Sequence, residues 1–146
     1  MSGENKQEER PMHLPITRLN PEAMPDAGKV GYSQISIVEP ERLAFVSGQV
    51  AWTVDGVATP DALDQQTDIV VQNLLAALNA LRAQPHDIVQ MRIYVVDLSP
   101  ETQGIAMERI ATFLEGAQPS LTGIGVAALA GPNLKIEVEM VVRVPA

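Results

Sequence analysis

Lys135 to Arg143, with the sequence KIEVEMVVR, is the stretch that decides the fold. Apolar and polar side chains alternate along it, and a period of two is typical of a β-strand with one buried face. The apolar face carries Ile136, Val138, Met140 and Val142, and the other face carries Glu137 and Glu139. A strand of this kind needs a second layer against its apolar face, so the sequence predicts a layered domain.

The residues before this strand supply that layer as two amphipathic helices. From Asp61 to about Ala83, apolar residues recur three or four positions apart, which indicates a helix. Ser99-Pro100-Glu101 combines an N-cap residue, a proline at the first helical position and an acid in the first turn. A second helix therefore begins there and ends near Gly116. We predict strands at Ile88–Val96 and Leu121–Leu129, and a final strand at Leu134–Val144.

The sheet is predicted to begin with a hairpin. Tyr32–Val38 and Leu43–Ser47 are rich in β-branched and aromatic residues, and the short gap between them favours antiparallel pairing. The resulting order is β-β-α-β-α-β-β. It predicts an α+β two-layer sandwich with a mixed sheet and two helices on one face.

The chain is predicted to form one domain preceded by a tail. Residues 1–28 begin with a polar run and then contain four prolines, so we expect a flexible tail that continues into an extended arm. Residues 29–146 form the single domain. Residues 1–10 lack the apolar core of a signal peptide, and no later run is long enough to span a membrane. No membrane association is expected.

Composition excludes several classes of site. Hydrophobic residues make up 46% and charged residues 19% of the 146 residues, which is globular composition. There is no cysteine and there are two histidines, so thiolate sites are excluded and a zinc cage or Ser-His-Asp triad is disfavoured. We predict a cytoplasmic protein without a metal site. The net charge of −8 argues against a nucleic-acid partner.

Two features point to chemistry on the sheet. Glu137 and Glu139 could act as a general acid and a general base if their surroundings differ. The alternative is that both glutamates lie on a solvated outer face of the sheet. The small-residue run Gly123–Ala128 predicts either close approach of another chain or a bulged or edge strand. Gly48 lies where a strand bends, and its backbone is a candidate ligand contact. Asn73 is interpreted as an amide that caps a neighbouring strand.

Several stretches in order resemble the RidA/YjgF family of reactive-intermediate deaminases. They are Gly31-Tyr32-Ser33-Gln34, Ser47-Gly48-Gln49, Gln72-Asn73-Leu74, Tyr94-Val95-Val96-Asp97, Pro119 to Val126 and Lys135 to Glu139. The resemblance runs from about Gly28 to Val144. It implies a chorismate-mutase-like fold, a homotrimer with small-molecule sites between subunits, and no cofactor. In active members water attacks the C=N carbon of a 2-imino acid, a glutamate activates the water, and an arginine binds the carboxylate.

Carried over by position, the catalytic glutamate is Glu137. The substrate-binding residues are Tyr32, Gly48, Leu121, Thr122 and Gly123. The family has Pro-Ala-Arg where this chain has Pro119-Ser120-Leu121, so a leucine replaces the carboxylate-binding arginine. An apolar side chain cannot supply the two parallel hydrogen bonds that a guanidinium offers to a carboxylate.

Three functions remain as hypotheses. The first is hydrolysis of a small imine or enamine with Glu137 as general base, with classical 2-imino acid deamination disfavoured by Leu121. The second is a non-catalytic metabolite-binding or regulatory trimer. The third is an endoribonuclease, which the net charge and the few aromatic residues disfavour. Arg92, Arg109 and Arg143 are the cations considered as substitutes for the missing arginine.

Overall fold

The computed structural model describes residues 15–146, which form ten short and long elements in sequence order. The helices are α1 (Leu63–Leu81) and α2 (Pro100–Leu114), with 3₁₀ turns η1 (Gly28–Val30) and η2 (Pro85–Asp87). The strands are β1 (Thr17–Leu19), β2 (Ile35–Ile37), β3 (Leu43–Gln49), β4 (Ile88–Val96), β5 (Ser120–Val126) and β6 (Ile136–Arg143). The predicted tail at residues 1–14 lies outside the described residues.

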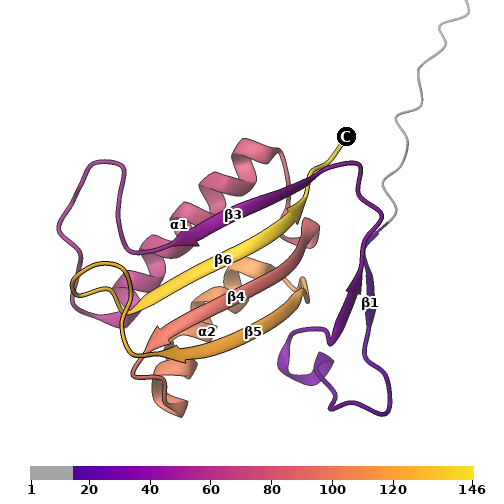
Figure 1. The fold of residues 1–146 in the computed structure, drawn as a ribbon, viewed down its shortest axis with the longest axis horizontal. Helices are drawn as coiled ribbons and strands as arrows, with labels where there is room; N and C mark the ends of the chain where they lie inside the picture. The colour runs from indigo at the N-terminus through magenta and orange to yellow at the C-terminus, as the bar shows by residue number, and fades with distance from the viewer. Residues whose placement is uncertain (1–14) are drawn as a thin grey trace, which may run out of the picture.

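Four strands form the main sheet in the order β3-β6-β4-β5. β6 is antiparallel to both β3 and β4, whereas β5 is parallel to β4. Both helices lie behind this sheet in Figure 1, and the near face is free of helices. The predicted α+β two-layer fold, with a mixed sheet and two helices on one face, is confirmed. We call the helix-free side the open face.

The core lies between the sheet and the helices. The alternating face of β6 contributes Ile136, Val138, Met140 and Val142, all buried. They pack in one cluster with side chains from both helices, including Val70 and Leu74 of α1 and Ile110 and Phe113 of α2. Full burial of one such side chain stabilises the fold by about 1.5–3 kcal/mol. The last strand therefore turns its apolar face toward the helices, as the alternation in KIEVEMVVR predicts.

The start of α2 has the cap that its sequence predicts. The Ser99 hydroxyl accepts a hydrogen bond from the Thr102 backbone N–H at 3.2 Å, and the Ser99 N–H donates to the Thr102 hydroxyl at 2.8 Å. This capping box satisfies donors that an uncapped first turn would leave free. It holds the first turn of α2 beside β5, where it borders a cavity described below.

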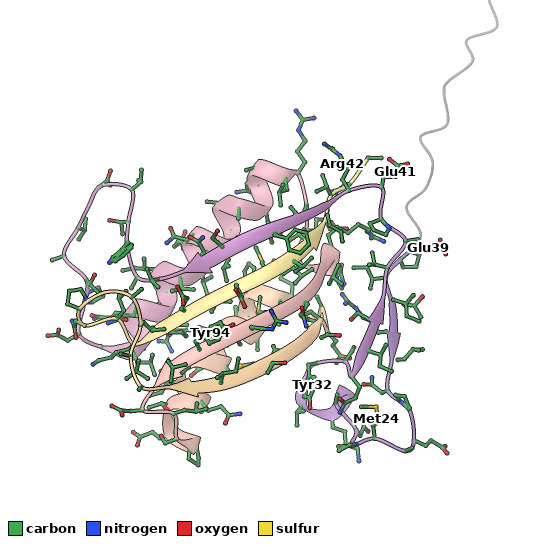
Figure 2. The ribbon with its side chains drawn as sticks, in the orientation of Figure 1. Met24, Tyr32, Glu39, Glu41, Arg42 and Tyr94 are labelled. Carbon is green, nitrogen blue, oxygen red and sulfur yellow. The ribbon has the colours of Figure 1, made fainter. Side chains whose placement is uncertain are left out.

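The predicted hairpin between Tyr32–Val38 and Leu43–Ser47 is wrong. β2 pairs with β1 instead, and β3 pairs with β6. A three-residue strand fits between Pro15 and Pro21, because proline is excluded from the middle of a ladder but tolerated outside it. Glu39, Glu41 and Arg42 mark the passage from this small ribbon to the main sheet in Figure 2.

We call residues 16–38 the N-terminal arm. Its division from the domain at residue 28 stays a prediction, but the arm is bound to the main sheet at several points. The Ser33 N–H donates to the Pro119 carbonyl at 3.1 Å, and the Ser36 and Ser120 hydroxyls lie 2.8 Å apart. The Arg18 guanidinium donates to the Ile88 carbonyl at 2.8 Å. These contacts hold Tyr32 next to the start of β5.

Candidate functional site

The two glutamates of β6 lie on the open face in different surroundings. Glu139 accepts a hydrogen bond from the Tyr94 hydroxyl at 2.6 Å and pairs with the Arg92 guanidinium at 3.3 Å. The Tyr94 hydrogen bond lowers the pKa of Glu139, and the same bond raises the pKa of Tyr94. Figure 2 shows Tyr94 near the middle of the sheet. Glu139 is therefore held as a bound carboxylate.

Glu137 is the carboxylate left without such partners. It lies opposite Tyr94 in the β4–β6 register, and no side-chain or backbone group of residues 15–146 donates a hydrogen bond to it. The side chain passes directly over Gly48 of β3. A Cβ atom added to Gly48 would lie 2.6 Å from the Glu137 carboxyl carbon, closer than atoms approach without displacement. The glycine is thus what allows Glu137 its position.

Glu137 and Gly48 border a cavity of about 170 Å³ at the end of β3. Trp52, Asn73 and Leu134 also line it. The Asn73 amide donates to the carbonyls of Val50 and Trp52 at 3.2 and 2.9 Å, which holds the chain as it leaves β3. The interpretation of Asn73 as an amide that caps a neighbouring strand is confirmed.

Tyr32, Leu121 and Gly123 border a second, larger cavity of about 630 Å³. It lies between the first turns of α2 and strand β5, on the helix side of the sheet. Leu121 pairs in register with buried Met91, so its side chain faces the helices and packs against the core. In Figure 2, Tyr32 lies on the side of the arm nearer to β5.

The predicted site residues thus fall into two groups within one chain. Leu121 is level with Met91 and Glu137 with Tyr94, and β4 lies between their strands. Strand spacing and rise put their Cα atoms roughly 14 Å apart, with the side chains on opposite faces. Thr122 is exposed on the open face, opposite in direction to Leu121, and lines neither cavity. One protomer does not bring Glu137 and Leu121 together.

The three arginines considered as substitutes are engaged elsewhere. Arg109 pairs with Asp64 and Asp68 of α1, at 3.6 and 2.9 Å. Arg92 pairs with Glu139 on the open face, and Arg143 lies 3.1 Å from Asp87. In the described part of the chain, no arginine or lysine lines the cavity that contains Leu121.

Acidic side chains at the start of α1 take part in these contacts and in one further hydrogen bond. Asp64 and Asp68 pair with Arg109, and Asp61 accepts a hydrogen bond from the Asn133 amide at 2.7 Å. Over residues 15–146, no group of three or more histidine and acidic side chains is arranged to hold a metal ion. In the same residues, neither helix has the length and apolar character needed to cross a bilayer.

Sequence reasoning missed the residues that α2 contributes to the larger cavity. Gln103, Gly104 and Met107 of α2 all line it. The feature of the sequence that could have indicated this part of the cavity was Gly104. A glycine inside a helix is about 1 kcal/mol less favourable than alanine, so its presence asks for a reason outside the helix.

The run of small residues proves to be an edge strand. β5 pairs with β4 along one side only, apart from a single bridge between Ser33 and Ser120. A Cβ atom at Gly125 would lie 3.1 Å from the Leu98 Cβ, so packing explains that glycine. Gly123 has open space where its side chain would be. Close packing within this chain therefore explains only one of the two glycines.

A mixed sheet with two helices on one face defines a small α+β two-layer class. The endoribonuclease L-PSP family model matches residues 23–144. The chain belongs to this family, which is also the RidA/YjgF family. The comparison with curated proteins finds no match.

Solved structures agree with this assignment. The Rid family protein YyfB from Yersinia pestis, described as of unknown function, is 36% identical, covers 89% of this chain and 99% of its own, and has a TM-score of 0.82. Rv2704 from Mycobacterium tuberculosis, of the YjgF/UK114 family, is 26% identical over 88% and 99%, with a TM-score of 0.60. RidA from an Antarctic Psychrobacter is 22% identical over 77% and 87%, with a TM-score of 0.63, and shows the fold alone.

Proposed function

We propose that the protein is a homotrimer that hydrolyses a small imine or enamine at sites between subunits, with Glu137 as the general base. The observation that carries this proposal is the separation of Glu137 from the cavity beside Leu121. Within residues 15–146, each protomer has a carboxylate without a hydrogen-bond partner and, on another strand and the other face, a ligand-sized cavity. Contact between two copies would place the Glu137 carboxylate of one copy beside the cavity of the other.

The open face supports contact between copies. Phe45 of β3 is 77% exposed and lies opposite Val141 on this face, beside a hollow of about 340 Å³. A large apolar side chain on a helix-free sheet is typical of a surface that another subunit covers. Burial there would also remove water from around Glu137 and Glu139, which strengthens their electrostatic interactions.

The chemistry needs one base and one water molecule. Glu137 takes a proton from the water as its oxygen adds to the C=N carbon, and that proton passes to the nitrogen. The hydroxyl proton of the resulting carbinolamine then passes to the amino nitrogen through Glu137, the carbon–nitrogen bond breaks, and ammonia leaves a carbonyl group behind. Glu137 fits this role better than Glu139, because Glu139 is already bound by Tyr94 and Arg92.

Leu121 bears on the substrate and favours a second candidate function. Since no cation lines the cavity in residues 15–146, a 2-imino acid would bring its carboxylate to an apolar surface without a partner. A cavity without a cation is also expected if the protein binds its ligand and does not catalyse a reaction. A non-catalytic metabolite-binding trimer is therefore the second candidate, and ammonia release that depends on Glu137 separates the two.

The first prediction is a trimer in solution. Light scattering is expected to give about three times the protomer mass of 15.7 kDa. Phe45→Glu is expected to lower that mass, because it places a charge on the open face. Ala76→Glu, on the exposed side of α1, is the matched control and should leave the trimer intact. A wild-type mass near 15.7 kDa would contradict the proposal.

The second prediction concerns the ribonuclease activity suggested by the family description. The net charge of −8 repels a phosphate backbone, so binding to single-stranded RNA at physiological salt should be weaker than about 10⁻⁴ M. Fluorescence anisotropy with a labelled mixed-sequence RNA measures it. Tight binding that falls steeply with salt, or cleavage that co-purifies with the trimer through several steps, would favour the nuclease.

A further inference from the structure

The larger cavity is uncharged and ligand-sized. Its volume of about 630 Å³ lies within the roughly 300–1,000 Å³ typical of small-molecule sites. Within the described residues its lining is mostly apolar, from the arm, β4, β5 and α2, and includes no acidic or basic side chain. An anionic ligand would lose its hydration there without gaining a cationic partner from this chain.

Two glycines widen this cavity. A Cβ atom added at Gly104 or at Gly123 would meet no other atom within 4 Å. Neither residue has the positive φ that would require glycine. Glycine in a helix or a strand lowers stability relative to alanine, and the packing of this chain does not need either one. Both glycines therefore leave open space along the wall of the cavity.

The polar groups of the lining are few and unengaged. The Tyr32 hydroxyl and the Gln103 side-chain amide make no hydrogen bond with any other group of residues 15–146. A hydroxyl and a primary amide offer donors and acceptors without charge. They suit a neutral polar group on the ligand, such as an amide or a ketone carbonyl.

We propose that this cavity selects an uncharged ligand with an aliphatic body, whose neutral polar end binds Tyr32 and Gln103. Gly104, Gly123 and Leu121 are then the residues that determine specificity for that body. The inference rests on the proposed function, since it names the substrate class of the same site. It explains in one step why a leucine stands in place of a guanidinium and why the neighbouring positions are glycine.

A matched pair of probes tests the charge preference. One is 4-methyl-2-oxopentanamide and the other is 4-methyl-2-oxopentanoate, which share an isobutyl body and differ in a carboxamide against a carboxylate. Calorimetric titration of the full-length trimer should give at least about tenfold tighter binding of the amide, because the carboxylate has no buried partner. Equal binding, or preference for the acid, overturns the proposal.

A second pair of probes tests the apolar body. Compared with 2-oxopropanamide, the isobutyl amide should bind at least about tenfold more tightly, since each buried methylene adds favourable transfer free energy. Gly104→Leu should weaken binding of the isobutyl amide at least about tenfold by filling the cavity. Ala111→Leu adds apolar bulk to the exposed side of α2 and is the matched control. The proposal fails if both variants bind like the wild type.

The outcomes separate this inference from the proposed catalysis. Tight, Gly104-dependent binding of the amide without ammonia release from any imine supports the inference and removes the catalytic proposal. Glu137-dependent hydrolysis of 2-imino acids together with weak amide binding supports the catalytic proposal and removes this inference. Gly104→Leu is expected to fold, because leucine is a better helix former than glycine and the added atoms enter open space.

Discussion

Leu121→Arg is expected to raise kcat/KM for 2-iminobutyrate hydrolysis by about 30-fold or more. The added guanidinium would enter the cavity of about 630 Å³ beside Tyr32 and bind the substrate carboxylate through two parallel hydrogen bonds. Truncating one partner of a buried charge pair costs about 2–5 kcal/mol, and tenfold in rate corresponds to about 1.4 kcal/mol. A steady-state assay of ammonia release from 2-iminobutyrate generated in situ measures the gain.

Two controls tie this gain to the proposed chemistry. Adding Glu137→Gln to Leu121→Arg should abolish it, because an amide cannot take the proton from water. The wild type should be slow on 2-iminobutyrate and little changed by Glu137→Gln alone. The mass of each variant is checked, so that loss of the trimer is not mistaken for loss of catalysis.

Mixed trimers extend the same experiment to the position of the site. The double variant Leu121→Arg/Glu137→Gln supplies a guanidinium but no base, and the wild type supplies a base but no guanidinium. If Glu137 and residue 121 act across a subunit boundary, dissociating and reassembling a mixture of the two should give activity that neither has alone. Activity that never exceeds that of the separate proteins would contradict a site shared between subunits.

Other outcomes have defined meanings. Robust Glu137-dependent hydrolysis of 2-iminobutyrate by the wild type would show that Leu121 does not disable carboxylate binding, and a cation from another copy would have to replace the arginine. If all variants are trimeric and inert on imines, the binding trimer becomes the better function. Arg109 is a poor substitute in either case, because it is paired with Asp64 and Asp68.

Gly48→Ala is expected to cause the second large effect, a loss of about 10–100-fold in Glu137-dependent activity measured in the Leu121→Arg background. The new methyl group would lie 2.6 Å from the Glu137 carboxyl carbon and its Oε1 atom, so the carboxylate must move. A misplacement of about 1 Å at a reacting group is able to cost about a hundredfold in rate. Steady-state ammonia release measures the loss.

The expected effect on stability is small, which separates displacement from unfolding. Gly48 does not have a positive φ, and the end of a glutamate side chain is free to turn away. Thermal unfolding should therefore change little, since alanine also lowers the entropy of the unfolded chain. Ser47→Ala, at the neighbouring exposed position of β3, is the control and should keep its activity.

A double-mutant cycle completes this test. If Gly48→Ala acts only through Glu137, then adding it to Glu137→Gln should produce no further loss. Additive losses from the two changes would mean that Gly48 contributes separately, for example through its backbone contact with a ligand. Full activity of the Gly48→Ala variant would contradict the prediction, because it would show that catalysis does not depend on where the Glu137 carboxylate lies.

Local pattern was sufficient for most of the fold. The alternation of residues 135–143 indicated which face of β6 is buried. The apolar period of α1 and the N-cap signal Ser99-Pro100-Glu101 located the two helices to within a few residues. β4 was predicted with its observed limits, Ile88–Val96. These features succeed because period, capping chemistry and proline exclusion act over a few neighbouring residues.

Strand pairing was not accessible in the same way. Tyr32–Val38 and Leu43–Ser47 look like a hairpin because they are close in sequence, yet β2 pairs with a strand that lies between two prolines. The partner of a strand depends on contacts far along the chain. No local pattern reports them, because pairing energy arises only once both strands and their buried faces are in position.

The sequence by itself determined that this is an α+β domain, that Glu137 shares a face with Glu139, and that residue 121 is an apolar leucine. Only the tertiary structure decided that Tyr94 and Arg92 bind Glu139 and, among residues 15–146, not Glu137, and that Glu137 and Leu121 lie on opposite faces. It also decided that Gly104 and Gly123 open onto one cavity. The physical reason is that a side chain's face follows from its own strand, whereas its neighbours follow from register and packing between segments far apart in the chain.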